Sequence, residues 1–325
     1  MPTKRIIIYA IAAFVFILAV LIYFFMFSAP QRAATAGQFI VSQDMDTTDT
    51  ISGLLTKGFI RSHIGFEIIF RIRNPIGTVI PGGYDISKSM NAWELAGVLS
   101  RKPSSVWVTI PEGLRKEEIA DILSKKLDWS AEQETEWITK DTTTNPDYTE
   151  GVYFPDTYLI PYEETPLQTV KRLQTHFEDK FAPYARQAAQ ENIKWTTTIK
   201  LASIIQREAG GKEDMPLVSG ILWNRLLKNM KLQADSTVQY ARGKTSQGWW
   251  APIKPADELL DSPYNTYLHA GLPPHPISNP GLDAISAALN PGKTQCIYYI
   301  HDSSGTIHCA VTYQEQLDNI QKYLK

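Results

Sequence analysis

The residue whose sequence context best suits it for chemistry is Glu208, in the stretch LASIIQREAGG at positions 201–211. Leu201, Ile204, Ile205 and Glu208 have the i, i+3, i+4, i+7 spacing that forms one face of an α-helix. The two glycines that follow predict the helix end, so Glu208 lies in the last turn, where the helix dipole is negative. Apolar neighbours and the dipole both favour the protonated carboxyl group, which a general acid requires. The alternative is an ordinary glutamate at the edge of the stripe that turns toward water.

Other kinds of catalytic centre lack their sequence signatures. The six histidines are scattered without an HExxH spacing, so we expect no catalytic metal. No GxSxG nucleophile motif, GxGxxG fingerprint or P-loop occurs, and we expect no cofactor. The formal net charge of −2 and the lack of a long Lys/Arg run argue against nucleic-acid binding. Carboxylates therefore remain as the candidate chemical groups.

Three segments after Glu208 could supply the rest of a binding groove. The first, DMPLVSGILWNRL, places Asn224 on an otherwise apolar helix. The second, LQADSTVQY at 232–240, gathers amide, carboxyl and hydroxyl groups. The third, SPYNTYLHAGLPPHPISNPG at 262–281, is too rich in Pro, Gly, Asn and Tyr for a regular helix and suits a groove wall. Each alone could be loop scaffolding, but together they offer the hydrogen-bonding groups and flat aromatic rings that a carbohydrate cleft uses.

The elements that must position these groups are mostly helical in the second half of the chain. Apolar spacing and capping residues predict helices at about 166–181, 183–191, 196–208, 214–228 and 281–288. In the first half, alternating apolar residues predict strands near 39–41 and 106–110, each followed by a helix, and a further helix at 92–99. Pro155 excludes a regular central strand in EGVYFPDTYLIP. Strands and helices are segregated, so the predicted fold class is α+β.

Residues 6–27, IIIYAIAAFVFILAVLIYFFMF, carry no charge over 22 positions. As a helix this run would span about 33 Å, which is enough to cross the apolar core of a bilayer. Lys4 and Arg5 precede it, so we expect a cytoplasmic N-terminus and an extracytoplasmic main part. A cleaved signal peptide is the alternative, since ATA at 34–36 resembles a cleavage site, but the apolar run is longer than the apolar region of a signal peptide, which has roughly 7–15 residues. We therefore predict a single-pass anchor in the cytoplasmic membrane.

The two cysteines, Cys296 and Cys309, flank IYYIHDSSGTIH, whose alternation around a turn predicts a β-hairpin. If the loop is 301–304, the cysteines lie directly opposite each other. A disulfide between them and a pair of free buried thiols are both open interpretations.

Six motifs, in this order, resemble those of the membrane-anchored endolytic murein transglycosylases, the MltG/YceG-like family. They are VTIPEG, EGVYFPDTY, LASIIQREAG, PLVSGILWNRL, KLQADSTVQY, and SPYNTY followed by GLPPHPISNPG. The resemblance covers nearly the whole chain. It implies a tail and anchor at 1–28, a tether at 29–38, a LysM-like α/β module at 39–105, and a helix-rich catalytic domain at 106–325. A second LysM-like segment is expected at about 106–127, and a C-terminal hairpin closes the chain.

The resemblance also implies an activity: endolytic cleavage of the β-1,4 bond between MurNAc and GlcNAc in nascent peptidoglycan. The product would be a 1,6-anhydro-MurNAc end that terminates glycan elongation, with penicillin-binding proteins as expected partners. Glu208 matches the family's catalytic glutamate. The expected substrate-binding residues are Glu150, Asn224, Gln233, Asp235, Thr237, Tyr240, Tyr264, Asn265 and Tyr267. His275 replaces a glycine that the family usually has, which bears on the local backbone and not on the acid. A non-catalytic peptidoglycan-binding scaffold is the alternative function.

Overall fold

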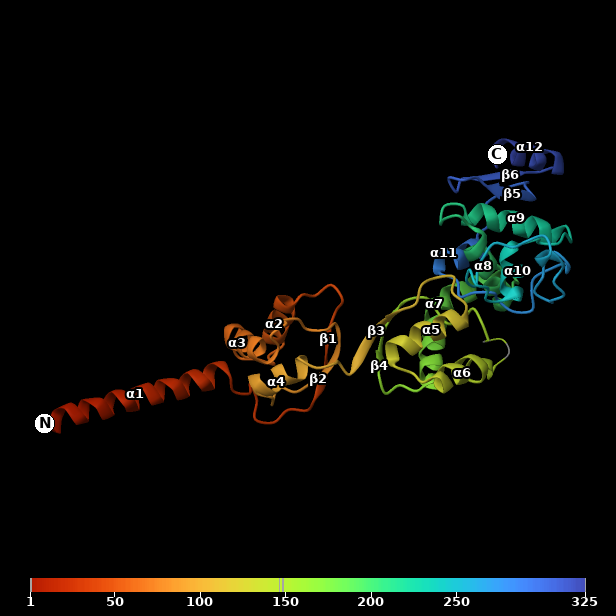
Figure 1. The fold of residues 1–325 in the computed structure, drawn as a ribbon. Coiled ribbons are helices and arrows are strands. Elements are labelled where there is room, and N and C mark those ends of the chain that lie inside the picture. Colours follow the sequence, from red (N-terminus) through yellow and green to blue (C-terminus); the bar gives the residue numbers. More distant parts are fainter. Residues whose placement is uncertain (1, 146, 148, 325) are drawn as a thin grey trace. The chain divides into compact units, whose positions relative to one another are not determined.

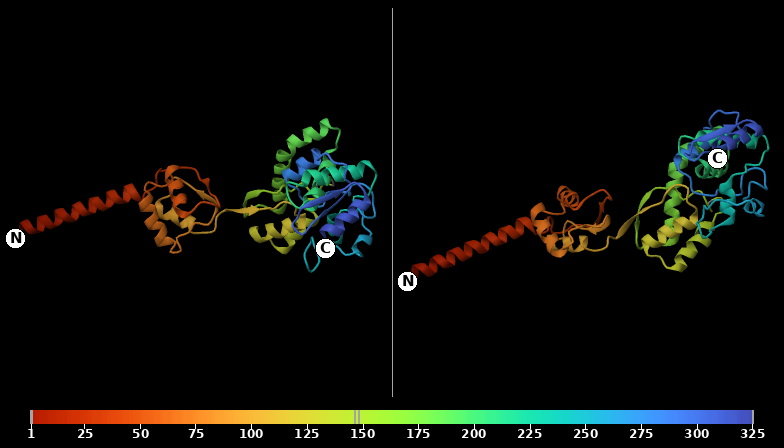
Figure 2. Two further views of the ribbon diagram at one scale, coloured as in Figure 1. Left: turned by 90° about the horizontal axis from the view of Figure 1, so that it is seen from above. Right: turned by 45° about the horizontal axis from the view of Figure 1, so that its top comes forward.

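The computed structural model describes residues 2–145, 147 and 149–324 and divides into two compact units (Figures 1 and 2). Unit 1 contains the chain up to Val108 together with Tyr158–Glu163, and unit 2 contains Thr109–Thr157 and the chain from Glu164 onward. Both units combine helices with short strands, and helices predominate in unit 2. The predicted mixed, helix-rich α+β class is therefore confirmed.

Unit 1 begins with helix α1 (Pro2–Met26), whose part Ile6–Met26 is apolar and long enough to cross a membrane. The side chains of Lys4 and Arg5, on which the expected orientation depends, lie outside the described residues. A sheet follows, with the strand order β1-β2-β3-β4. The elements of this unit after α1 are β1 (Gly37–Val41), α2 (Thr47–Thr56), α3 (His63–Arg73), β2 (Gly82–Ile86), α4 (Ala92–Leu99), β3 (Ser105–Thr109) and β4 (Thr157–Pro161).

The core of unit 1 lies between this sheet and the helices α2, α3 and α4. Phe39 and Val41 alternate inward on β1, as the sequence predicts, and both are buried. Helix α4 occupies the predicted range, and Asn91 caps its N-terminus through a side-chain hydrogen bond. Gly82 and Gly83 pair with the end of β1 and begin β2. Helix α3 has no counterpart among the predicted elements.

The polar segment between α1 and β1, predicted as a tether, lies along unit 1. The Gln31 N–H donates to the Lys88 carbonyl over 3.0 Å, and the Ser87 hydroxyl donates to the Ala34 carbonyl over 2.7 Å. Composition indicated a loop here but not these long-range hydrogen bonds. The segment that follows α1 is therefore hydrogen-bonded to the rest of unit 1.

Unit 2 is organised around helix α8, which packs against α7, α9, α10 and α11 (Figure 1). Leu201, Ile204 and Ile205 on α8 are fully buried in this bundle, which confirms the predicted apolar stripe. The elements of unit 2 are α5 (Lys116–Leu127), α6 (Ala131–Thr139), η1 (Asp141–Thr143), α7 (Pro166–Gln190), α8 (Trp195–Glu208), α9 (Met215–Leu227), α10 (Asp235–Arg242), η3 (Asp257–Leu259), α11 (Leu282–Leu289), β5 (Tyr298–His301), β6 (Ile307–Ala310) and α12 (Tyr313–Tyr323).

The two helices predicted at 166–181 and 183–191 form one continuous helix, α7. Pro183 lies inside it, and a proline normally interrupts a helix because it lacks an N–H and crowds the preceding turn. Phe177, Phe181 and Ala188 are buried on both sides of Pro183. Packing of this stripe against the rest of unit 2 therefore overrides the local preference for a break.

Strands β5 and β6 pair antiparallel, and a disulfide joins Cys296 to Cys309. The predicted register, with the two cysteines directly opposite, is wrong: Tyr299 is the residue that pairs with Cys309. The turn occupies 302–306 instead of 301–304, which shifts the pairing. The strands pack against α9 on one side and α12 on the other (Figure 1).

Candidate active site

Glu208 is the last residue of α8, and its half-buried carboxylate accepts hydrogen bonds at both oxygens. The backbone N–H and the hydroxyl of Ser236 donate to Oε1 over 3.0 and 2.6 Å. The hydroxyl of Tyr299 donates to Oε2 over 2.7 Å. The carboxylate is thus fixed between two segments that lie far from α8 in the sequence.

Helix α10 supplies the donors on one side of this carboxylate. The first N–H groups of a helix have no partner within the helix. The residue at the N-cap of α10, Ala234, has no side chain that could accept from them. Glu208 accepts the N–H of Ser236 instead, so it caps α10 from a different helix. The positive N-terminal end of α10 thereby offsets the negative C-terminal end of α8.

Strand β5 supplies the donor on the other side. Burial, followed by the charge of Glu208, raises the pKa of Tyr299 well above its usual value. The Tyr299 hydroxyl therefore keeps its proton and donates it to the hydrogen bond with Glu208. Tyr299 is not among the predicted site residues, because the alternation in IYYIH indicates a strand but not which residue the strand contacts. The residue that Tyr299 contacts is Glu208, which lies 91 positions earlier in the sequence.

Three predicted substrate-binding residues lie around the first turn of α10. Asp235 is exposed and accepts a hydrogen bond from the Tyr267 hydroxyl over 2.6 Å. Gln233 is also exposed, has a left-handed φ of 47°, and its N–H donates to the Thr266 carbonyl. These residues leave polar groups at the surface beside Ser236, within reach of a ligand that approaches Glu208.

Two other predicted residues, Thr237 and Asn265, are fully buried. The Thr237 hydroxyl lies 2.9 Å from that of Thr266, and the Asn265 side chain donates to the carbonyls of Glu258 and Leu260 over 2.9 Å each. The first contact holds the start of α10 against the YNTY loop, and the two bonds of Asn265 hold that loop against the preceding η3 turn. Thr237 and Asn265 therefore position the exposed residues and do not reach the surface themselves.

Glu150 is only 1% exposed, so it lies behind the surface instead of on it. Asn279 donates to its Oε1 over 2.7 Å, the N–H of Lys116 donates to its Oε2 over 3.2 Å, and the Tyr240 hydroxyl is 3.5 Å from Oε2. Burial, aided by the charge of Glu117, raises the pKa of Glu150 to about 7. Glu150 lies beside the start of α5, so its one carboxyl group holds α5, α10 and the Asn279 segment together.

The two remaining predicted tyrosines belong to this buried cluster. Tyr240 and Tyr264 pack with ring centroids 4.8 Å apart. Tyr240 follows Ser236 by one helical turn, so both point from the same face of α10. One face of α10 therefore contacts Glu208 through Ser236 and Glu150 through Tyr240.

Two half-buried tryptophans follow α10, and one of them, Trp250, lies beside the helix that carries Glu208. The guanidinium of Arg207 stacks 3.9 Å from the centroid of the Trp250 ring, and that of Arg115 lies 4.2 Å from the Trp249 ring. The indole N–H of Trp250 donates to Glu118 over 2.8 Å. Flat aromatic surfaces of this kind suit sugar rings. In the sequence, the only indication of these aromatic surfaces is the high content of Trp, Pro and Gly in the segment.

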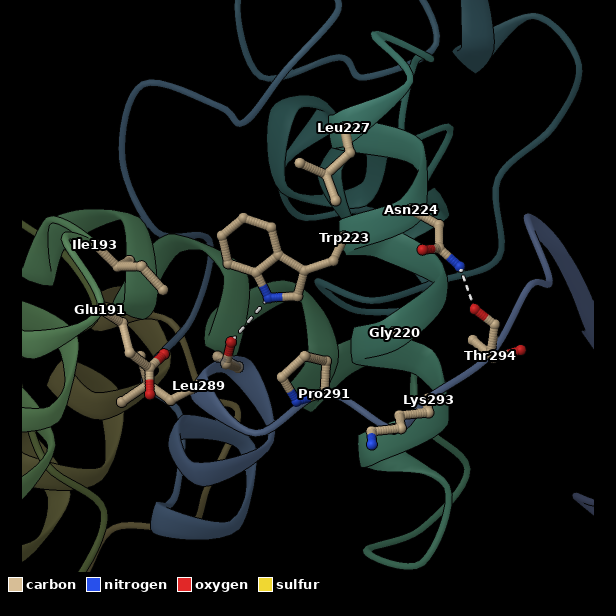
Figure 3. A pocket seen from close by; sticks show the side chains of 12 residues that line it. Glu191, Ile193, Gly220, Trp223, Asn224, Leu227, Leu289, Pro291, Lys293 and Thr294 are labelled. Atoms are coloured by element: carbon tan, nitrogen blue, oxygen red, sulfur yellow. Dashed lines mark hydrogen bonds between the residues drawn. The ribbon is translucent and has the colours of Figure 1, made fainter.

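Asn224 lies on α9 and binds the segment that precedes β5. Its side chain donates to the carbonyls of Thr294 and Cys296 over 2.9 and 3.0 Å. It also borders an apolar pocket of about 390 Å³, in which the Trp223 ring is held by a hydrogen bond to the Ala288 carbonyl (Figure 3). The described residues that line this pocket do not include Glu208 or its hydrogen-bond partners. Asn224 therefore anchors the chain that leads into β5.

His275 has a negative φ, so the backbone there does not need the glycine that the resemblance led us to expect. Burial, followed by the charge of Lys200, lowers the pKa of His275. The substitution therefore introduces no backbone strain into the segment that leads to Asn279.

Comparison with known proteins places these features in a family. The model of the YceG-like family matches residues 39–322. A protein named endolytic murein transglycosylase from Bacillus subtilis strain 168 is 27% identical over 304 residues, which cover 86% of this chain and 82% of that protein. One of the same name from Streptococcus pneumoniae strain D39 is 26% identical over 316 residues, covering 87% of this chain. The chain spans only 56% of that relative's length.

A solved structure has a related fold. The crystal structure of a YceG-like protein from Listeria monocytogenes aligns with a TM-score of 0.61 and 24% sequence identity. The alignment covers 87% of this chain and 98% of that one. The arrangement of helices and strands is thus shared over most of both chains.

Proposed function

Since the chain belongs to the YceG-like family, we propose that it is an endolytic murein transglycosylase with Glu208 as its acid and base. The observation that carries this proposal is the fixed Glu208 carboxyl group at the end of α8, with donors on each oxygen and exposed polar groups beside it. The names of the relatives from B. subtilis and S. pneumoniae support the choice of peptidoglycan as substrate.

The proposed reaction needs one carboxyl group and no water. Glu208 gives its proton to the oxygen that links MurNAc C1 to GlcNAc C4, and the C1–O bond breaks. The C6 hydroxyl oxygen of the same MurNAc bonds to C1, and its proton passes to Glu208. The products are a 1,6-anhydro-MurNAc end and a free GlcNAc 4-hydroxyl, and the enzyme regains its starting state. Most other glycosidases require a second carboxylate to activate water or to bind the sugar.

We further propose that some of the other site residues contact the glycan and that the rest position them. Gln233, Asp235 and Tyr267 contact the glycan, because their polar groups reach the surface around Ser236. The remaining predicted residues position these groups from behind or from the side, because they are buried, bonded to the backbone or, as two half-buried tyrosines, packed against each other. They are Glu150, Asn224, Thr237, Tyr240, Tyr264 and Asn265.

The location that fits this function is the outer face of the cytoplasmic membrane. Helix α1 is the candidate anchor, with the N-terminus in the cytoplasm and both units outside. Nascent glycan strands arise at that face, so cell-wall synthases such as penicillin-binding proteins are the expected partners. A LysM-like role for unit 1 is part of the same proposal.

Digestion of purified glycan strands by the full chain and by Glu208→Gln tests the proposal. We expect anhydro-MurNAc ends from the wild type and none from the variant, with unchanged thermal unfolding. Products one water heavier would identify a hydrolase. A wild type that binds strands without cutting them would favour the scaffold alternative, and an active Glu208→Gln protein would refute the role of Glu208.

A further inference from the structure

Helix α3 exposes an unusual apolar stripe on the outside of unit 1. Ile64, Ile68 and Ile72 are 65%, 48% and 60% exposed, and their i, i+4, i+8 spacing places them in one row along the helix. Phe66 and Phe70 on the opposite face are fully buried in the core. The outer face of a surface helix is normally polar. This helix is therefore apolar on two faces, of which only one has a partner within the described residues.

The end of α1 lies directly beside this stripe. Gly65 follows Ile64 on the helix, and a Cβ at Gly65 would lie 2.9 Å from the Met26 carbonyl oxygen, so glycine permits the close approach. The Phe27 carbonyl accepts a hydrogen bond from the N–H of Ala92 over 2.9 Å. The last turn of α1 is thus fixed against α3 and the start of α4, as Figure 1 shows for α1 and α3.

Residues typical of a membrane surface surround the same spot. The Arg61 guanidinium donates to the Ala29 and Pro30 carbonyls just after α1. Arg73 stacks 5.0 Å from the ring centroid of Trp93, which is 48% exposed. Tryptophan and arginine are favoured at the boundary between headgroups and acyl chains, where an apolar body and a polar or charged end are both satisfied.

We propose that α3 lies on the outer surface of the bilayer that α1 crosses, with its three isoleucines in the boundary between headgroups and acyl chains. The proposal rests on α1 as a membrane anchor and is independent of the catalytic role of Glu208. If α1 spans the bilayer, its end at Met26 lies at the membrane surface, and the contact between Met26 and Gly65 holds α3 at the same depth. Anionic lipid headgroups complement Arg61 and Arg73 near the stripe, while Arg71 is paired with Glu67 on the same helix over 2.8 Å.

The structural consequence is that unit 1 is held against the membrane at two places. A helix that spans the bilayer alone leaves the following domain free to rotate about the helix axis. A second contact through α3 removes that freedom and sets the orientation of unit 1 to the surface. The lipid is the favoured partner over a second protein because the stripe adjoins the end of α1.

Fluorescent labels on the full chain in lipid nanodiscs test this proposal. An environment-sensitive dye is attached to Ile68→Cys and, as a matched control, to Ile40→Cys, since Ile40 is 41% exposed on β1 of the same unit. The native cysteines are joined in a disulfide and do not compete for the dye. We expect blue-shifted emission and quenching by nitroxide-labelled lipids at position 68, and neither effect at position 40.

Two results would overturn the proposal. Water-like emission at position 68 would place α3 in solvent, and shielded emission without lipid quenching would mean that protein, such as a second copy of the chain, covers the stripe. A third label at Val15→Cys, in the middle of α1, tests the premise separately. Quenching at position 15 but not at 68 would refute the inference while leaving the anchor intact, and no quenching at 15 would refute both.

Discussion

Replacing Tyr299 by phenylalanine removes one hydroxyl that donates to Glu208 and leaves the ring in place. The hydrogen bond to Oε2 is 2.7 Å long and is the only one that this oxygen accepts among the described residues. Without it, the Glu208 carboxyl group is held only through Oε1 by Ser236. The group can then rotate about its last side-chain bond, away from the orientation that protonates the glycan.

The size of the effect follows from the kind of bond that is lost. A hydrogen bond to a charged group contributes about 1.5–3 kcal/mol. If that contribution is made in the transition state, kcat falls about 10- to 100-fold, because each 1.36 kcal/mol corresponds to about a factor of ten in rate. KM should change little, since Tyr299 contacts Glu208 and is not among the residues proposed to contact the glycan.

The assay is the rate at which anhydro-MurNAc ends appear, measured over a range of glycan concentrations. Tyr298→Phe is the matched control, because Tyr298 lies on the same strand but packs against Tyr313, with ring centroids 6.0 Å apart. It should leave the rate unchanged. A Tyr299→Phe protein that unfolds at the wild-type temperature and keeps kcat within about twofold would refute the reasoning.

Two further predictions concern the carboxyl cluster and the disulfide. The pKa of Glu150 rises from 4.5 to about 7 on folding, so the wild type loses stability as pH rises through that range, by about 3 kcal/mol. Glu150→Gln should lack this loss. If this is wrong, urea unfolding will give the same difference in the free energy of unfolding between the two proteins at pH 4.5 and at pH 8. The Cys296–Cys309 disulfide closes a loop whose length corresponds to a stabilisation of about 3 kcal/mol. Reduction of this disulfide should lower kcat. Reduction should not lower the kcat of the Tyr299→Phe protein further, because both changes act through the hydrogen bond from Tyr299 to Glu208. Additive losses of kcat would contradict this reasoning.

Local patterns along the chain predicted much of the architecture. The apolar stripe of α8, helix α4, strand β1 and the apolar run of α1 all follow from spacing within five to twenty-five residues. Such spacing reports which face of an element is buried, because side-chain direction repeats with a fixed period. It does not report what covers that face, and for this reason α7 was split at Pro183 and the exposed stripe of α3 was overlooked.

The candidate site shows again that sequence patterns do not report which segments cover a residue. Sequence placed Glu208 at the end of a helix and on its apolar side, and motif resemblance gave it a role. It also grouped Glu150 with the surface residues, although the structure buries it under Tyr240 and Asn279. Burial depends on every segment that packs over a residue, so a motif identifies a position without fixing its depth.

By itself, the sequence determined that this protein has an apolar N-terminal helix, a helix-rich α+β body and a glutamate at a helix end, which is the candidate acid. Only the tertiary structure decided which groups hold that glutamate, because its partners Ser236 and Tyr299 lie 28 and 91 residues away on other elements. Contacts at such separations form when the elements pack, and no periodicity along the chain encodes them. The same is true of α3, whose position beside the end of α1 depends on the packing of Gly65 against Met26.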